Sequence, residues 1–404
     1  MHTRLGKLSI SLVVFTALLF YGLQSTARAV LLQPISEDFG VSYTESGLIF
    51  LISFLSVLAA NIAAGRLMQR FGMRAVYVAS ILGIVLALLV QAYSTVYGVF
   101  LFATFMLTVF TSGQNLAGNS LVATAFAGDG GSKLNLMHVF YGLGSCLAAL
   151  IFPLIVVGTG SAIFDWREIF IILAFLFLVV LAWYPFYRFK PRERAVPEAA
   201  LPHAEPGFWR AMKDPLLLKI SLAAIFATGY EVSVSSWLVY VLEAGVGTST
   251  GFAVLMLALF FAGLAIGRAG GSFLARRNWL AGLLFPLSVF QAVLAVLSLV
   301  FLPAVPWLFA FAGLTSSIYF PTFYYKIAHL CPAAASGAVF LVLSGFGIAF
   351  FPFMVGVLGD LATIRWGLAI APFCAVLLIP SLRYYQREEK KRIAKLSLRG
   401  IPVA

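Results

Sequence analysis

The sequence predicts an all-α protein that crosses a membrane twelve times, in two similar halves of six helices. Of its 404 residues, 62% are hydrophobic and only 10% are charged, and the mean hydropathy is +1.00. Soluble domains are about 45–50% apolar and about 25% charged. An apolar surface of this extent is stable in lipid, where exposed side chains carry no hydration penalty and helices satisfy their own backbone hydrogen bonds.

Twelve apolar runs approach or exceed the 20 or so residues that a membrane-spanning helix needs. The basic N-terminus and the sequence Ala27-Arg28-Ala29 also fit a cleavable signal peptide. We expect the first run to be a helix instead, because the remaining pattern requires an even number of spans. The predicted spans are Leu8–Val30, Ser46–Arg66, Ala75–Tyr93, Tyr97–Ala125, Asn135–Val157, Ile169–Tyr187, Leu216–Leu242, Gly251–Ala275, Leu280–Phe301, Pro306–Lys326, Ser336–Leu358 and Trp366–Tyr384.

Basic residues gather in alternate loops, for example Arg70 and Arg74 after the second run, whereas acids such as Glu37 and Asp38 lie in the others. Because positively charged loops stay in the cytoplasm, we expect an inner-membrane protein with both termini cytoplasmic. The net charge of +12 then reflects orientation in the membrane, and nucleic acid is not an expected partner.

Lys190–Asp214 is the one long polar segment, and its four prolines are typical of a linker. We therefore predict an N-terminal bundle over 1–189, a cytoplasmic linker over 190–214, a C-terminal bundle over 215–388 and a cytoplasmic tail over 389–404. The halves repeat, since Gly22-Leu23-Gln24 in the first helix has a counterpart in Gly229-Tyr230-Glu231 in the seventh. Such duplication is typical of secondary transporters.

Polar side chains inside the spans are the candidate binding residues, because each is costly in the membrane unless it faces a cavity or a partner. Amides and hydroxyls pair with hydroxyl groups of a ligand, and aromatic rings cover the apolar face of a sugar. This mixture suits a neutral polyol better than a lipophilic drug. The predicted substrate-binding residues are Gln24, Arg28, Asn115, Asn119, Tyr141, Glu231, Trp237, Gln291, Tyr319 and Tyr324.

Glu231 is the only acid deep inside a predicted span. A carboxylate there takes up a proton or binds a cation; the alternatives are a glutamate satisfied by hydrogen bonds or a fixed ion pair with Arg28. His138, near the cytoplasmic end of the fifth span, is a second candidate for ion coupling, or else a hydrogen-bonding residue of the gate. Asn115 and Asn119 also suit hydrogen bonds between helices, and Arg28 also suits snorkelling to the interface.

Motifs for enzymatic chemistry are absent from the sequence. It has no Walker-type phosphate loop, no metal-ligand cluster and no nucleophile elbow. Cys146, Cys331 and Cys374 are scattered and read as packing residues. We therefore predict no enzymatic activity, no cofactor and no metal.

The stretch from Gly65 to Arg74, Gly-Arg-Leu-Met-Gln-Arg-Phe-Gly-Met-Arg, resembles the G-x-L-x-D-R-x-G-R motif of the major facilitator superfamily. Gln69 stands where that family has aspartate, so the family's acidic lock is altered. The resemblance implies the 6+6 pseudo-symmetric fold of that family. It also implies gating roles for Gly65, Arg66, Arg70, Arg74 and, at the matching place in the eighth helix, Arg268.

Four further stretches are similar to the fucose–galactose–glucose:proton symporter family: Tyr21-Gly22-Leu23-Gln24, the segment 134–144, Gly229-Tyr230-Glu231 and Ser344-Gly345-Phe346-Gly347. This resemblance implies uptake of a hexose or deoxyhexose together with a cation, usually a proton. Ala29 and Asn115 stand at the positions of the acids used by the fucose branch. Glu231 must then do more of the coupling, unless the ion is sodium or the protein is a facilitator.

The favoured hypothesis is a monomeric cation-coupled sugar importer working by alternating access, with the substrate between the first, fourth, seventh and tenth helices. The alternative is a proton-driven exporter of drugs or other lipophilic compounds. Exporters of the superfamily carry G-x-x-x-G-P-x-x-G-G in the fifth helix. Here Gly142 and Gly144 are present without the Gly-Pro and Gly-Gly pairs. A membrane sensor is a third hypothesis, for which the segment after Tyr384 is too short to hold a signalling domain.

Overall fold

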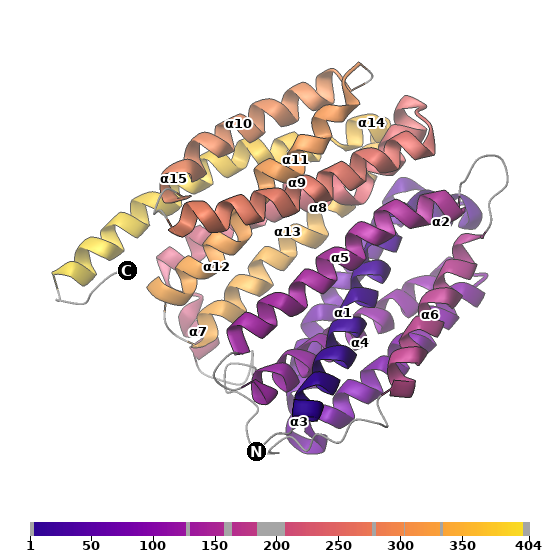
Figure 1. Cartoon of the computed structure of the whole chain (residues 1–404). Helices are drawn as coiled ribbons and strands as arrows, with labels where there is room; N and C mark the ends of the chain where they lie inside the picture. The colour runs from indigo at the N-terminus through magenta and orange to yellow at the C-terminus, as the bar shows by residue number, and fades with distance from the viewer. Residues whose placement is uncertain are drawn as a thin grey trace. The chain divides into compact units, whose positions relative to one another are not determined.

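The structure is a computed structural model that describes residues 4–126, 130–156, 164–183, 207–276, 280–302, 304–331 and 334–398. It forms two compact units (Figure 1), one of Met1–Val41 with Ile52–Pro202 and one of Ser42–Leu51 with His203–Ala404. Most of the predicted linker, 190–206, lies outside the described residues. The predicted domain boundaries therefore stay a prediction.

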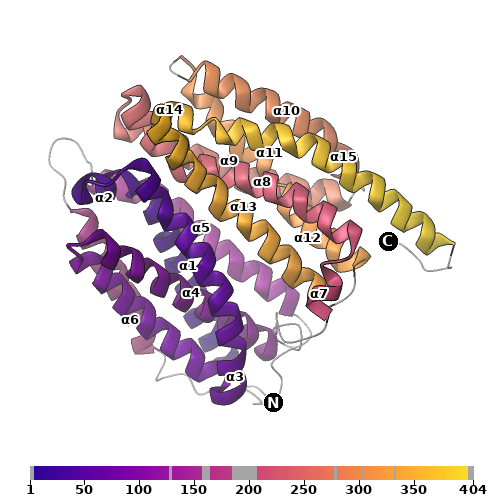
Figure 2. The same cartoon turned by 180° about the vertical axis from the view of Figure 1, so that it is seen from behind.

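All regular structure in the described ranges is helical (Figures 1 and 2). The first helices are α1 (Arg4–Val30), α2 (Leu32–Phe39), α3 (Tyr43–Tyr93), α4 (Tyr97–Ala125), α5 (Gly130–Val156) and α6 (Trp166–Trp183). The remaining helices are α7 (Gly207–Ala211), α8 (Pro215–Tyr240), α9 (Thr250–Arg276), α10 (Leu280–Val300), α11 (Ala310–Ser316), α12 (Tyr319–Leu330), α13 (Ala334–Leu361), α14 (Ile364–Gly367) and α15 (Ile370–Ser397).

The described residues contain nine helices long and apolar enough to cross a membrane. Two shorter apolar helices, Tyr43–Val57 and Val139–Phe152, coincide with the second and fifth predicted spans. The tenth predicted span is covered by α11 and α12. The predicted all-α, twelve-helix membrane fold is confirmed.

A glycine separates the second and third predicted spans within α3. Gly72 has the non-helical dihedral angles φ 84° and ψ 154°, whereas the residues on both sides of it are helical. Residues with a Cβ rarely adopt positive φ, so this glycine sets the bend between the two spans.

Two spans deviate from regular α-helix in ways that hydropathy does not predict. The tenth begins as a 3-10 turn, Pro306–Phe309, and its helical hydrogen bonding lapses between α11 and α12 at Ser317 and Ile318, although both residues keep right-handed helical dihedral angles. The seventh, α8, ends in a π-helical segment, Val241–Val246. Broken helices and π-bulges are frequent near functional sites.

The last span also differs from prediction. The expected helix Trp366–Tyr384 is two helices, α14 and α15. α15 continues to Ser397, through most of the predicted tail.

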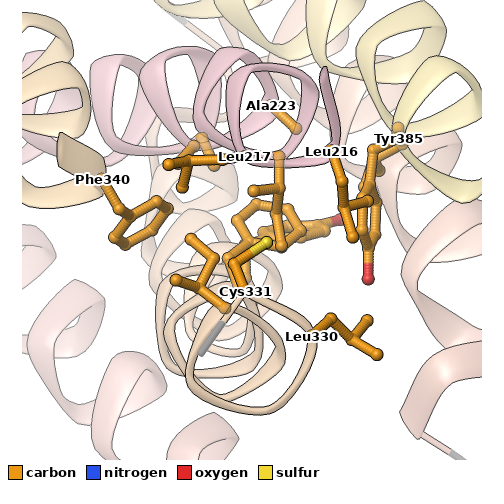
Figure 3. Packing of buried hydrophobic residues seen from close by; sticks show 14 of the residues in the cluster. Leu216, Leu217, Ala223, Leu330, Cys331, Phe340 and Tyr385 are labelled. Atoms are coloured by element: carbon orange, nitrogen blue, oxygen red, sulfur yellow. The ribbon is translucent and has the colours of Figure 1, made fainter. Parts of the chain in front are cut away.

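The core of the second unit includes a cluster where α8, α12, α13 and α15 meet (Figure 3). Leu216 and Leu217 of α8 pack there with Cys331, at the end of α12, and Phe340 of α13. Tyr385 of α15 is completely buried in the same cluster. Asp214 caps the start of α8, since its carboxylate accepts from the backbone N–H of Leu216 at 2.9 Å.

The beginning of α3 is capped twice within the second unit. Ser42 and Glu45 form a reciprocal capping box, with the Ser42 N–H 2.8 Å from the Glu45 carboxylate and the Glu45 N–H 3.2 Å from the Ser42 hydroxyl. From α13, Asp360 accepts from the N–H groups of Tyr43 at 3.0 Å and Thr44 at 2.8 Å. A carboxylate at this place satisfies two free donors and complements the helix dipole.

Replacing Asp360 with alanine is expected to lower the free energy of unfolding by about 1 kcal/mol, because two donors at the start of α3 lose their acceptor. Thermal unfolding of the purified protein in detergent measures this. Asp360→Asn keeps one acceptor oxygen and is expected to lie between wild type and Asp360→Ala. Equal stability of all three proteins would show that the cap contributes nothing.

Candidate functional site

In the first unit, polar and aromatic side chains of α1, α4 and α5 meet. The Tyr21 and Tyr141 ring centroids are 5.2 Å apart, and Tyr21 also lies next to Asn115 and Arg28. The Tyr141 hydroxyl donates to Ser25 at 3.2 Å. We call these four residues, Tyr21, Arg28, Asn115 and Tyr141, together with Gln24, which lies one turn after Tyr21 on α1, the α1 cluster. Four of these five are predicted substrate-binding residues.

Arg28 is held by a hydroxyl group. Its Nη1 donates to Ser53 at 2.9 Å, and the Thr108 hydroxyl lies 3.5 Å from the same Ser53 oxygen. Among the described residues no carboxylate is within ion-pair distance of Arg28. A guanidinium has five N–H donors, so Arg28 can still donate to a ligand.

Gln24 is the most unusual buried polar residue of α1. Its side chain is 1% exposed, and neither amide atom has a hydrogen-bond partner among the described residues. In the same part of the chain, the amide oxygen of Asn119, one turn beyond Asn115 on α4, also has no partner. The buried Gln91 is half paired, since its Nε2 donates to Thr104 at 2.8 Å and only its Oε1 has no partner among the described residues. A buried polar group left unpaired costs about 1–3 kcal/mol, and a ligand with hydroxyl groups would recover that cost.

In the second unit, Glu231 on α8 pairs with Arg268 on α9. The charged atoms are 3.6 Å apart, and the side chains are 19% and 48% exposed respectively. Arg268, to which the resemblance assigned a gating role, therefore contacts the coupling candidate directly. The pair is open enough for an ion or a substrate to exchange with either partner.

Next to Glu231 in the sequence, Tyr230 points toward the broken helix. Its hydroxyl lies beside Thr315, at the end of α11. Tyr319, the first residue of α12, lies near Tyr230, and its hydroxyl is buried with no partner in the described part of the chain. We call Tyr230, Glu231, Arg268, Thr315 and Tyr319 the α8 cluster.

The other candidates in the second unit lie apart from this cluster. Gln291 on α10 is fully buried, and the ranges that the structure describes offer no partner to either of its amide atoms. Trp237 is also fully buried, and its indole N–H donates to the Pro352 carbonyl at 2.8 Å, which is a packing role. Tyr324 is 45% exposed and stacks on Phe320.

The predicted gate residues lie around the bend in α3. Arg66 and Arg70 are exposed, and the Arg70 guanidinium lies 5.2 Å from the centre of the Phe71 ring. Gly65 is helical, and Arg74 follows Gly72. The side chain of His138, the second coupling candidate, lies outside the described residues.

Sequence reasoning missed the hydroxyl residues that support these clusters. Ser25 contacts Tyr141, Ser53 contacts Arg28, and Thr108 contacts Ser53. Thr315 begins the run Thr315-Ser316-Ser317, directly before the helix break. Consecutive hydroxyl residues compete for backbone hydrogen bonds in helices, and this run was the available signal for the break. Among the described residues, no group of three or more His, Cys, Asp or Glu side chains is placed to hold a metal.

Comparisons with known proteins agree with this architecture. The family model described as Major Facilitator Superfamily matches residues 13–352. A glucose/galactose transporter of Brucella abortus is 27% identical over 382 residues, which cover 90% of this chain and 91% of that protein.

Solved structures share the fold at low sequence identity. A bacterial homologue of the human lysosomal transporter Spinster aligns with a TM-score of 0.81 and 14% identity, covering 95% of this chain and 98% of that one. The fucose:proton symporter of E. coli aligns with a TM-score of 0.63 and 18% identity, covering 93% and 98%.

Proposed function

The chain belongs to the Major Facilitator Superfamily, and from this premise we propose that it imports a sugar, a hexose or deoxyhexose, together with a cation. It is a multi-pass membrane transporter and not an enzyme. The proposal extends to an inner-membrane location with both termini in the cytoplasm, as the distribution of basic loops predicts.

The observation that carries the sugar proposal is the buried, unpaired amide of Gln24 in the α1 cluster. An amide offers a donor and an acceptor together, which is what a sugar hydroxyl needs. The paired rings of Tyr21 and Tyr141, one helical turn away, offer an apolar surface. The Brucella relative, described as a glucose/galactose transporter, supports the same substrate class.

The second unit contributes a similar set of groups. Within the described residues the hydroxyl of Tyr319 is buried and has no partner, at the start of α12. A buried polar group without a partner is costly unless a ligand satisfies it. The proposal therefore gives the α8 cluster two roles, sugar binding through Tyr319 and ion coupling through Glu231.

The test is uptake into proteoliposomes under an imposed inward proton or sodium gradient. Radiolabelled glucose, galactose and fucose should accumulate above the outside concentration in at least one combination. Accumulation of none of them, with binding of lipophilic cations instead, would replace the sugar proposal with the exporter alternative.

Replacing Gln24 by leucine, which is close in size, is expected to raise the KM for sugar uptake about tenfold or more. The reason is that one or two hydrogen bonds to the substrate, worth about 1–3 kcal/mol, are lost. Initial rates of uptake at graded sugar concentrations measure this.

The matched control is Gln91→Leu, a buried glutamine whose Nε2 donates to Thr104 at 2.8 Å. It is expected to lower thermal stability while leaving the KM close to that of wild type. A KM unchanged by Gln24→Leu would remove Gln24 from the sugar site.

A further inference from the structure

The C-terminal part of α15 extends past the apolar section of its own helix. The first charged residue of α15 is Arg383, and the helix continues to Ser397. At 1.5 Å per residue, its 28 residues exceed the hydrocarbon core of a bilayer, which is about 30 Å thick. In both views its end projects beyond α10 and α12 (Figures 1 and 2). The charged part of α15 therefore belongs at the membrane surface.

One side of this segment is anchored by ion pairs to α12 and to the beginning of α8. The Nη2 of Arg392 donates to both carboxylate oxygens of Asp214, at 2.6 and 2.8 Å. Both acids of the segment also form ion pairs on this side. The pairs are Lys219 with Glu388 at 2.6 Å and Lys326 with Glu389 at 2.7 Å.

Apolar residues anchor the neighbouring side. Tyr385 is buried against Leu216 and Cys331 (Figure 3), and Ile393 packs against the same cluster. Together with the ion pairs, this packing fixes the rotation of α15 about its axis. The direction in which its remaining side chains face is therefore determined.

On the opposite side of α15, the charged residues are all basic. Successive turns supply them at intervals of three or four, with one adjacent pair, Lys390 and Lys391, which places them on one face of a helix. All are exposed, and within the described residues none forms an ion pair. Tyr384, beside them, is 59% exposed. This basic face consists of Arg383, Arg387, Lys390, Lys391 and Lys395.

We propose that the basic face binds the headgroups of anionic phospholipids. Clusters of four to eight Lys and Arg directly after a spanning helix attract anionic lipid. An exposed tyrosine at the start of the cluster is typical of the headgroup level. The two acids of the segment pair with Lys219 and Lys326, which leaves most of the positive charge of the basic face available to anionic headgroups.

Native mass spectrometry of the full-length protein in detergent tests this, with phosphatidylglycerol and phosphatidylcholine as probes. Wild type is expected to bind phosphatidylglycerol at least tenfold more tightly. The variant Arg387→Gln, Lys390→Gln, Lys391→Gln, Lys395→Gln is expected to lose most of that preference, since each basic residue contributes about fivefold. Arg383 is left in place because it lies over the Phe285 ring, 4.5 Å from its centre.

Two controls separate this proposal from general electrostatics and from misfolding. Lys390→Arg, Lys391→Arg, Lys395→Arg keeps the charge and should keep the preference. The variant Arg210→Gln, Lys213→Gln removes two exposed charges near the start of α8. It should weaken the binding of phosphatidylglycerol less than the variant Lys390→Gln, Lys391→Gln does. Equal lipid preference in the quadruple variant and wild type would overturn the proposal. The proposal would also be overturned if millimolar inorganic phosphate displaced bound phosphatidylglycerol from the wild type as readily as added phosphatidylglycerol does.

Discussion

Glu231→Gln is expected to abolish accumulation of sugar against its gradient while sparing exchange of sugar across the membrane. Glutamine keeps the size and one acceptor of glutamate but can neither carry charge nor take up a proton. The internal-to-external ratio in proteoliposomes should fall to about one. Counterflow of labelled sugar should remain near the wild-type rate, since it requires binding and rocking but no net movement of the ion.

The geometry around Glu231 explains this expectation. The carboxylate is 19% exposed, and Arg268, 3.6 Å away, is the cation beside it. A charged group in the membrane is tolerated when a partner offsets its cost. Under the proposed coupling, a proton or sodium ion bound at Glu231 would take over that role from Arg268 and weaken the ion pair. Occupancy by the ion would then change the contact between α8 and α9, which is the differential interaction that coupling requires.

Three companion variants sharpen the experiment. Glu243→Gln alters an acid in the π-helical segment after α8 and should leave accumulation intact. Arg268→Gln should also impair coupling. The double variant should be no worse than either single one, because both remove the same interaction. Loss of exchange together with accumulation would reassign Glu231 to substrate binding, and full accumulation by Glu231→Gln would contradict the coupling role.

The positions of the spans could be predicted because hydropathy is a local property of the chain. The bend at Gly72 falls between the second and third predicted spans, where the apolar pattern is interrupted. The break between α11 and α12 could not, since both pieces are apolar and the interruption at Ser317 and Ile318 leaves the hydropathy unchanged. The helical extension of α15 was missed because charged residues read as a tail unless their anchors on α8 and α12 are known.

The candidate site divides in the same way. The stripe Tyr21, Gln24, Arg28 could be predicted because residues three or four apart share a helix face. The partner of Glu231 could not, because Arg268 is on another helix and pairing across helices leaves no local pattern. Nor does the sequence separate Gln24 from Gln91. Both are buried amides, and only the structure shows that one donates to Thr104 and the other has no partner.

Gly144→Ala is expected to cause the largest loss of stability among these substitutions, about 3 kcal/mol or more. A Cβ at Gly144 would lie 1.9 Å from the carbonyl oxygen of Leu19 on α1 and 3.1 Å from the backbone nitrogen of Leu23. Both are backbone atoms, which cannot rotate away, so α1 and α5 must separate. Overpacking of this kind costs about 1–3 kcal/mol even where side chains give way. Thermal unfolding in detergent and the yield of monodisperse protein measure the effect.

Gly142→Ala is the matched control, because it lies on the same helix and its Cβ would meet nothing within 4 Å. Alanine there should be neutral or slightly stabilising, since glycine is the poorer helix former. Equal stability of the two variants would show that the close approach of α1 and α5 does not matter.

The same substitution in the second unit tests whether this close packing is a property of the repeated architecture. A Cβ at Gly347 on α13 would lie 2.2 Å from the carbonyl oxygen of Ile225 on α8, so Gly347→Ala should be as damaging as Gly144→Ala. Small residues allow helices to approach closely where no hydrophobic effect drives them together. Gly144 and Gly347 also set how closely the helices that carry Gln24 and Glu231, α1 and α8, pack against α5 and α13. Second-site variants that restore stability to Gly144→Ala without restoring uptake would separate the folding role of this packing from its role in positioning the α1 cluster.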